Sequence, residues 1–266
     1  MPAVDIGARE LHVVRRGAGE PLLLIHGLAG THGIWGEPFL AVLDGTFEVL
    51  AYDQRGVGFS SPSEGPFTIA DLADDAAALL DALGLASAHV VGTSMGGMVA
   101  QELALRHPEK VRTLVLGCTY AGGPGSVITD RAVIGRFLDA IRGGEVELTL
   151  RTGFEINMAP AAREREGAYR NYRRLALAAP CPREVIVEQA RATATHDTSA
   201  RLGGVEAPTL ILHGDLDEML VVANARHIAG LMPGARLEIL EGVGHLFWIE
   251  EPERSAALIV HAAGGA

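Results

Sequence analysis

The chain has 266 residues, of which 48% are hydrophobic and 21% are charged. This length and apolar fraction suit one large domain with an inserted subdomain, and they exclude a disulfide-stapled miniprotein and wholesale disorder. The formal net charge of −11 disfavours nucleic acid and anionic membranes as partners, because phosphate groups are bound by clustered Lys and Arg. The two cysteines, Cys118 and Cys181, lie far apart without metal-type spacing, so we expect neither a zinc site nor a disulfide framework.

Targeting signals are not evident in the sequence. The first 20 residues carry no basic segment followed by an apolar stretch, and no uncharged apolar run reaches the length that spans a membrane. The sequence therefore predicts a soluble, cytoplasmic protein without a signal peptide.

Six short apolar runs alternate with helical patterns along the chain. Hydrophobicity in these runs is continuous rather than alternating, as strands covered on both faces require, so we expect a mostly parallel sheet. Residues 10–15 are expected to add an antiparallel edge strand. The six predicted strands span residues 22–27, 47–53, 88–92, 111–116, 208–214 and 235–240.

Helical patterns fill the gaps between these runs, which predicts an α/β fold with a parallel sheet flanked by helices. Thr68 to Asp71 has the spacing of a capping box, and Leu72 begins a run of apolar residues at helical spacing. Further helices are predicted over residues 98–106 and from Pro252 onward.

The interval from residue 120 to residue 201 breaks this alternation, because it holds helical patterns but no strand-like run. Glycine-rich, hinge-like segments open and close it. We therefore predict a core formed by residues 1–119 and 202–266, with a helical cap at 120–201 over the carboxyl edge of the sheet, where open α/β sheets bind their ligands.

The segment Gly92-Thr93-Ser94-Met95-Gly96 has the G-x-S-x-G pattern between a buried strand and a helix. In this context small residues allow a sharp, strained turn that exposes the Ser94 hydroxyl, and the following helix N-terminus favours developing negative charge. The pattern predicts a nucleophilic serine.

A serine hydroxyl needs a base that is itself oriented by a carboxylate. His245 and Asp217 each follow a predicted strand, so both should lie at the carboxyl edge of the sheet with Ser94. Asp215 competes with Asp217 for the role of the acid, and we favour Asp217. For His26 and His213, which precede glycines at strand ends, we expect packing against the backbone rather than the role of the base.

The segments around His26, Asp53, Ser94, Asp217 and His245 together resemble the α/β-hydrolase superfamily over essentially the whole chain. The likeness is closest to small-substrate esterases and enol-lactonases with a helical cap. It implies an oxyanion hole formed by the backbone N–H groups of Leu28 and Met95, and no metal or organic cofactor. Serine at position 94 argues against dehalogenases and epoxide hydrolases, which carry aspartate there. The absence of Gly-Pro-Gly after His26-Gly27 weakens a reading as a carbon–carbon bond hydrolase.

The reaction expected from these residues is hydrolysis of an ester or lactone of a small molecule through an acyl-enzyme on Ser94. Two alternatives stay open. One is a ligand-sensing protein of the same superfamily that turns over slowly, and the other is a lyase or a perhydrolase that uses the same three residues.

Overall fold

The computed structural model describes residues 3–264, which form an eight-stranded sheet with the strand order β1-β2-β4-β3-β5-β6-β7-β8. Neighbouring strands from β4 to β8 are parallel, whereas β2 is antiparallel to both β1 and β4. The mostly parallel sheet is thus as predicted. The strands are β1 (Ala3–Asp5), β2 (Glu10–Gly17), β3 (Glu20–Ile25), β4 (Phe47–Tyr52), β5 (Ala88–Thr93), β6 (Val111–Gly117), β7 (Thr209–Gly214) and β8 (Arg236–Leu240).

The N-terminal edge of the sheet differs from the prediction. The strand expected at residues 10–15 is β2, but the edge itself is the three-residue strand β1, which pairs Ala3 with His12. A strand this short has too few residues to show a pattern of its own.

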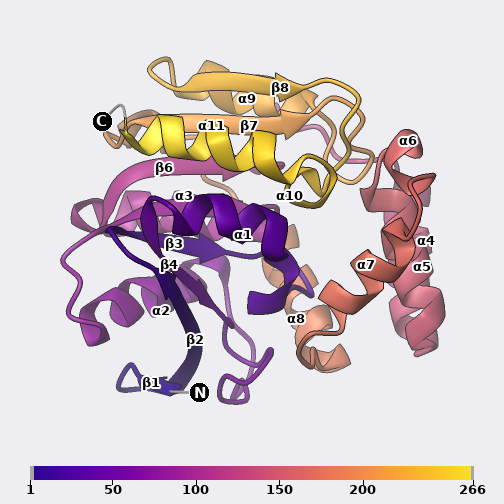
Figure 1. The fold of residues 1–266 in the computed structure, drawn as a ribbon, viewed down its shortest axis with the longest axis horizontal. Helices are drawn as coiled ribbons and strands as arrows, with labels where there is room; N and C mark the ends of the chain where they lie inside the picture. Colours follow the sequence, from indigo (N-terminus) through magenta and orange to yellow (C-terminus); the bar gives the residue numbers. More distant parts are fainter. Residues whose placement is uncertain (1–2, 265–266) are drawn as a thin grey trace.

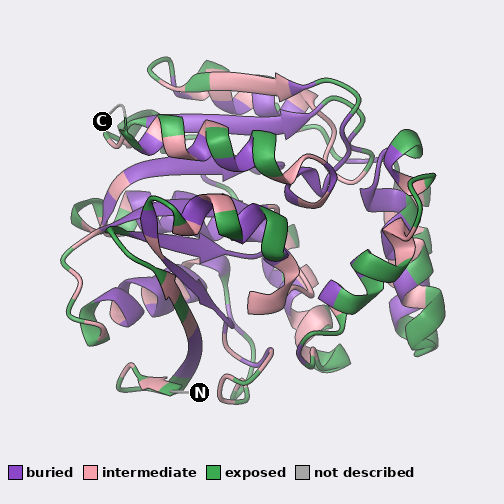
Figure 2. Ribbon diagram, viewed as in Figure 1, coloured by how far each residue is buried: buried purple, intermediate pink, exposed green. Residues whose placement is uncertain are grey.

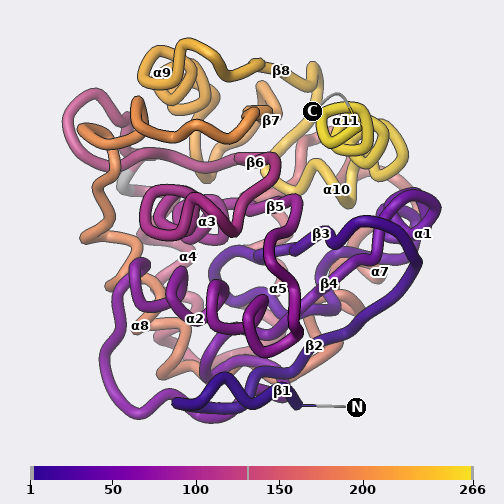
Figure 3. The backbone as a smooth tube through the Cα atoms, turned by 90° about the vertical axis from the view of Figure 1, so that its left-hand side faces the viewer, coloured from indigo at the N-terminus to yellow at the C-terminus, as the bar shows by residue number. Residues whose placement is uncertain are grey.

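Helices cover both faces of the sheet (Figure 3). One face carries α1 (Glu37–Asp44) and α11 (Pro252–Gly264), which contact each other; the other carries α2 (Ile69–Ala82), α3 (Met95–Arg106) and α9 (Ala223–Leu231). Because the sheet is covered on both sides, its central strands β3 to β7 are largely buried while the helices show exposed outer stripes (Figure 2).

The predicted capping box is present at the start of α2. The Thr68 hydroxyl accepts a hydrogen bond from the Asp71 N–H at 3.2 Å, and the Asp71 carboxylate accepts one from the Thr68 N–H at 2.7 Å. Two N–H groups that the helix leaves without partners are thereby satisfied.

Between β6 and β7 the chain forms five helices, and Figure 1 shows four of them, α4 to α7, beyond the carboxyl ends of β7 and β8. The five are α4 (Arg131–Gly143), α5 (Val146–Asn157), α6 (Pro160–Arg163), α7 (Ala168–Ala176) and α8 (Arg183–Ala194). We call residues 120–201 the helical insertion. The remaining short elements are η1 (His32–Trp35), η2 (Pro108–Lys110), η3 (Leu202–Gly204) and α10 (Phe247–Glu250). Within residues 3–264, no helix has the length and apolarity needed to cross a membrane.

Candidate active site

Ser94 lies on a sharp turn between the end of β5 and the start of α3. Its backbone has φ 55° and ψ −123°, a region that L residues rarely adopt and that costs about 1–3 kcal/mol. The turn is held to the next strand, because the Ser94 N–H donates to the Gly117 carbonyl at 2.9 Å and the Ser94 carbonyl accepts from the Thr119 hydroxyl at 2.8 Å. Neighbouring atoms therefore hold the serine in its strained conformation.

Glycines beside the serine are required by close packing. A Cβ on Gly92 would lie 2.2 Å from the Gly96 carbonyl oxygen, and a Cβ on Gly96 would lie 2.0 Å from the Ile25 carbonyl oxygen. Both contacts are far shorter than side chains tolerate, so the G-x-S-x-G pattern has a direct steric cause here.

The loop that follows β3 lies directly against the serine. A Cβ on Gly27 would meet the Ser94 Cβ at 2.8 Å, so the residue before Leu28 packs directly against the serine. Neither Leu28 N–H nor Met95 N–H, which is in the first turn of α3, donates a hydrogen bond to another group within residues 3–264. Free donors beside the nucleophile are what stabilisation of an oxyanion needs.

This loop is also braced by the helical insertion. Ala29 has a positive φ of 59°, and its N–H donates to the side-chain oxygen of Gln189 in α8 at 2.9 Å. Gln189 is fully buried. Sequence reasoning did not identify this residue, because its partner lies 160 positions away along the chain.

Asp217 and His245 form a buried pair. The His245 Nδ1 lies 2.7 Å from the Asp217 Oδ2, and the two residues are both 4% exposed. The other carboxylate oxygen accepts hydrogen bonds from the backbone N–H groups of Met219 and Leu220, each at 2.8 Å. The competing residue Asp215 is exposed and instead accepts a hydrogen bond from the Gly242 N–H at 2.7 Å.

The pair has the electrostatics of a carboxylate that stabilises an imidazolium. Burial alone would raise the pKa of Asp217, but the charge of His245 and the hydrogen bonds from His213 and His245 outweigh it and lower the pKa to about 2. Burial alone would lower the pKa of His245, but the charge of Asp217 and the neighbouring Cys118 thiol raise it well above 6.5. The imidazole of His245 is therefore a stronger base than an unperturbed histidine.

His213 has a contact that the sequence did not indicate. Its Nε2 lies 2.6 Å from the Leu220 carbonyl oxygen and 3.1 Å from the Asp217 Oδ2. A residue expected to pack against the backbone thus also touches the carboxylate. No spacing rule signals this contact, because it depends on the loop after β7 folding back over its own strand.

The loop that carries His245 is fastened to the helical insertion. The N–H groups of His245 and Leu246 donate to the Asn157 carbonyl at 2.9 and 3.1 Å. The buried Glu250 carboxylate accepts from the N–H groups of Gly244 and Ala159, each at 3.1 Å. These contacts hold the imidazole and the end of α5 in one arrangement.

Cys118 connects the serine turn with the imidazole. It follows β6 with a φ of 39°, its thiol acts on the pKa of His245, and it is close to the backbone N–H of Ser94. Burial raises the pKa of the Cys118 thiol, so the thiol stays protonated near neutral pH. Within the described residues, no hydrogen bond joins the Ser94 Oγ to the imidazole.

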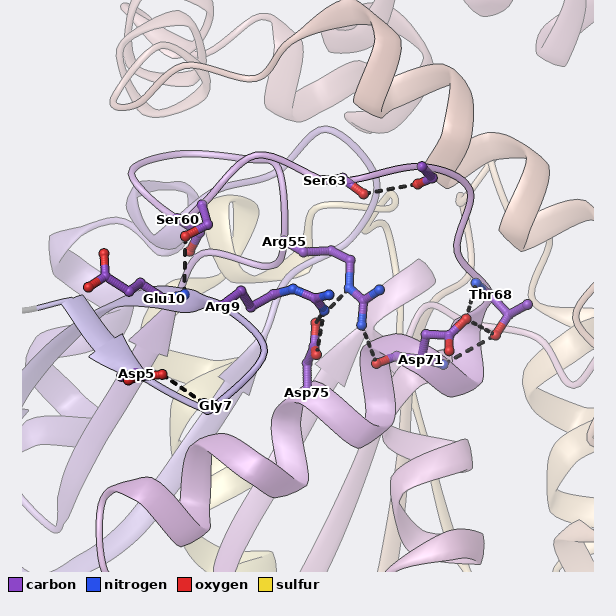
Figure 4. Close-up of polar contacts among 12 residues, drawn as sticks. Asp5, Gly7, Arg9, Glu10, Arg55, Ser60, Ser63, Thr68, Asp71 and Asp75 are labelled. Atoms are coloured by element: carbon purple, nitrogen blue, oxygen red, sulfur yellow. Dashed lines mark hydrogen bonds and ion pairs between the residues drawn. The ribbon is translucent and has the colours of Figure 1, made fainter.

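Two other residues have polar contacts outside this group. The Arg55 guanidinium points toward α2, where it donates to the Asp75 carboxylate at 2.6 Å and to the Asp71 carbonyl at 3.0 Å (Figure 4). Arg9 donates to the same Asp75 carboxylate, so these bonds fasten the turn after β4 to α2. His196 is buried beside Gln101, and burial lowers its pKa to about 4.

Comparison with known proteins places this geometry in a family. The family model of the α/β hydrolase fold matches residues 20–252 of this chain. A protein assigned as the carbamate hydrolase RutD of Caulobacter vibrioides is 32% identical over 97% of this chain and 95% of its own length. The structure of the enol-lactonase from Burkholderia xenovorans LB400 has a TM-score of 0.87 at 25% identity, covering 99% of this chain and 100% of its own. The structure of the thermophilic esterase from Thermogutta terrifontis has a TM-score of 0.81 at 27% identity, and the match covers 95% of this chain and 92% of the esterase chain. The chain therefore belongs to the α/β-hydrolase fold family and is a hydrolase of that fold.

Proposed function

We propose that the protein is a serine hydrolase that cleaves a carboxylic ester or lactone of a small molecule. The observation that supports the proposal is the buried 2.7 Å pair of His245 and Asp217, which Cys118 links to the strained turn of Ser94. A strengthened imidazole base within reach of a serine hydroxyl is the arrangement that turns serine into a nucleophile.

In the proposed reaction His245 takes the proton of Ser94 through its Nε2, while the Ser94 Oγ attacks the substrate carbonyl carbon. This transfer requires the Ser94 Oγ and the His245 Nε2 to come into hydrogen-bond contact. The N–H groups of Leu28 and Met95 hold the oxyanion, and Asp217 stabilises the imidazolium. His245 then protonates the leaving alkoxide, and a water molecule activated by the same imidazole hydrolyses the acyl-enzyme.

We further propose that the helical insertion acts as a cap on this site. Support comes from Gln189, which braces the Leu28 loop, and from Asn157, which holds the His245 loop. Through these contacts the insertion fixes both the oxyanion donors and the base, so its movement would change both together.

The relatives support acyl chemistry in general, because the similar proteins are an enol-lactonase, an esterase and a protein assigned as a carbamate hydrolase. All three names describe attack on a carbonyl group by water. The assay must therefore determine which type of carbonyl bond this chain cleaves.

The test is turnover of p-nitrophenyl acetate and butyrate, of small lactones and of an aryl carbamate by the parent and by Ser94→Ala. We expect at least about a 10⁴-fold loss of kcat/KM on the preferred substrate. Ser63→Ala serves as the control, because this hydroxyl bonds only to Gly65 in an exposed loop. Activity of Ser94→Ala within about tenfold of the parent contradicts the mechanism.

Two outcomes of the same assay would favour the alternatives. A burst of one product per chain without further turnover would indicate a sensing protein, and a product that changes when peroxide is added would indicate a perhydrolase. Steady multiple turnover to acid and alcohol supports the proposed hydrolase.

A further inference from the structure

His12, His32 and Asp53 form a buried cluster outside the proposed catalytic group. His12 lies on β2, His32 begins η1, and Asp53 follows β4. Strands β2 and β4 pair side by side, and the Asp53 N–H donates to the His12 carbonyl at 2.9 Å. One ring nitrogen of each histidine and one carboxylate oxygen of Asp53 all lie within 4.8 Å of one another. We call these three residues the His12–His32–Asp53 cluster.

The carboxylate of the cluster is ionised and oriented. Asp53 is fully buried, and its oxygens accept hydrogen bonds from the backbone N–H groups of His32 at 2.7 Å and Phe59 at 3.0 Å. The His32 Nδ1 lies 3.0 Å from both oxygens. Burial alone would raise the pKa of Asp53, but the hydrogen bonds from His32 and Phe59 outweigh it and lower the pKa.

His12 supplies a second, independent observation. It is 3% exposed, and its buried Nε2 has no hydrogen-bond partner within the described chain. A buried ring nitrogen that no protein group satisfies is unfavourable unless something else binds it. The ring is held in place by edge contacts with the His32 and Phe59 rings, at centroid distances of 4.8 and 5.2 Å.

We propose that the His12–His32–Asp53 cluster binds one divalent transition-metal ion, of which Zn²⁺ is the natural candidate. Two imidazoles and one carboxylate form a ligand set that suits zinc, cobalt and nickel rather than magnesium or calcium, which prefer oxygen ligands alone. The ion takes the position of the proton that the His32 Nδ1 shares with Asp53, and water completes its coordination. The Phe59 and His32 backbone N–H groups remain as outer partners of the carboxylate.

The expected role of this ion is structural. It ties β2 and the end of β4 to the segment that begins at His32, and His32 is only four residues beyond Leu28. Binding to the folded state alone stabilises that state. The metal is therefore separate from the hydrolysis reaction, and its test does not depend on activity.

The test uses the full-length chain without a histidine tag, stripped of metal with a chelator that is then removed. Co²⁺ is titrated as a spectroscopic probe and Zn²⁺ by calorimetry, with the thermal unfolding midpoint as the second readout. We expect one ion per chain, visible-region Co²⁺ bands of an imidazole–carboxylate site, and a higher Tm with Zn²⁺.

His12→Ala and His32→Ala should each weaken Co²⁺ binding at least tenfold, whereas His261→Ala, which removes an exposed histidine of α11, should leave it unchanged. The partly exposed His32 keeps the test valid if the His12 variant fails to fold, and far-ultraviolet circular dichroism of each variant checks this. The proposal is overturned if His32→Ala folds and binds Co²⁺ as tightly as the parent, or if the parent binds no Co²⁺ at a 1:1 ratio.

Discussion

The imidazole of His245 and the carboxylate of Asp217 are joined at 2.7 Å across 28 residues of sequence, and both are nearly inaccessible to solvent. The carboxylate accepts further hydrogen bonds from two backbone N–H groups, and the charge of His245 lowers its pKa in spite of its burial. This pair determines the protonation state of the proposed base, and most of our predictions depend on it.

Replacing the carboxylate should disable the base while leaving the fold intact. Asp217→Asn is expected to lower kcat by about 10⁴-fold, because the amide can hold the imidazole in the wrong tautomer and cannot stabilise its charged form. Asp215→Asn is the matched control and should change kcat less than about twofold, since the exposed Asp215 carboxylate bonds to the Gly242 N–H and not to His245. Equal losses in the two variants would contradict the assignment of the acid.

The pH dependence of activity should show a base with a raised pKa. Because Asp217 raises the pKa of His245 well above 6.5, kcat/KM should increase with pH through an inflection above 6.5. In Asp217→Asn the raising charge is gone, so the inflection of the residual activity should move to lower pH. The measurement is kcat/KM on one ester from pH 5 to 10, and an inflection that does not move contradicts the coupling.

Stability should depend on the same pair at acidic pH. The pKa of Asp217 is about 2 in the folded state and near 3.8 when unperturbed, so its stabilising effect is complete above pH 3.8 and is lost as pH falls toward 2. This difference corresponds to about 2 kcal/mol. The gap in unfolding free energy between the parent and Asp217→Asn should therefore shrink between pH 5 and 2, as measured by urea unfolding. A constant gap contradicts this linkage.

Much of the fold could be predicted because the buried strands are continuous apolar runs; β3, β5 and β7 lie where the sequence indicated. The elements missed include β1, α1, α5 and α9. A three-residue strand is too short to show a hydrophobic pattern. The apolar residues of α1 and α9 did not form a helical repeat that stood out from the neighbouring segments.

For the site, the glycines around Ser94 and the positions of Asp217 and His245 after strands could be found from sequence patterns. Their partners could not. His213, Glu250 and Gln189 act through contacts between distant loops, and only the folded chain brings those loops together. The His12–His32–Asp53 cluster could not be predicted for the same reason, since its members are separated by 20 and 21 positions and lie on β2, on η1 and after β4.

His213 should act as a positioning residue for Asp217. Removing its Nε2 in His213→Ala is expected to lower kcat about tenfold to a hundredfold, because a hydrogen bond to a charged group contributes about 1.5–3 kcal/mol. His213→Gln, which keeps a donor, should recover part of the loss. The readout that separates positioning from instability is the pH profile, whose inflection should shift in His213→Ala. An unchanged inflection with a lower Tm would indicate a structural role alone.

The Gly27 position tests whether the loop after β3 serves the serine. Gly27→Ala introduces a Cβ that would lie 2.8 Å from the Ser94 Cβ, so either the loop or the serine must move. We expect kcat to fall by about a hundredfold, comparable to the loss of one oxyanion donor. The control is Gly135→Ala in α4, where the added Cβ meets open space. Full activity of Gly27→Ala would show that the Leu28 donor is not needed.

Covalent labelling tests the central claim most directly. An aryl fluorophosphonate should react once per chain, and peptide mapping by mass spectrometry should place the adduct on Ser94, with the rate reduced at least about a hundredfold in His245→Gln. An adduct on Cys118, an adduct on another residue, or labelling that is equally fast in His245→Gln would contradict the account.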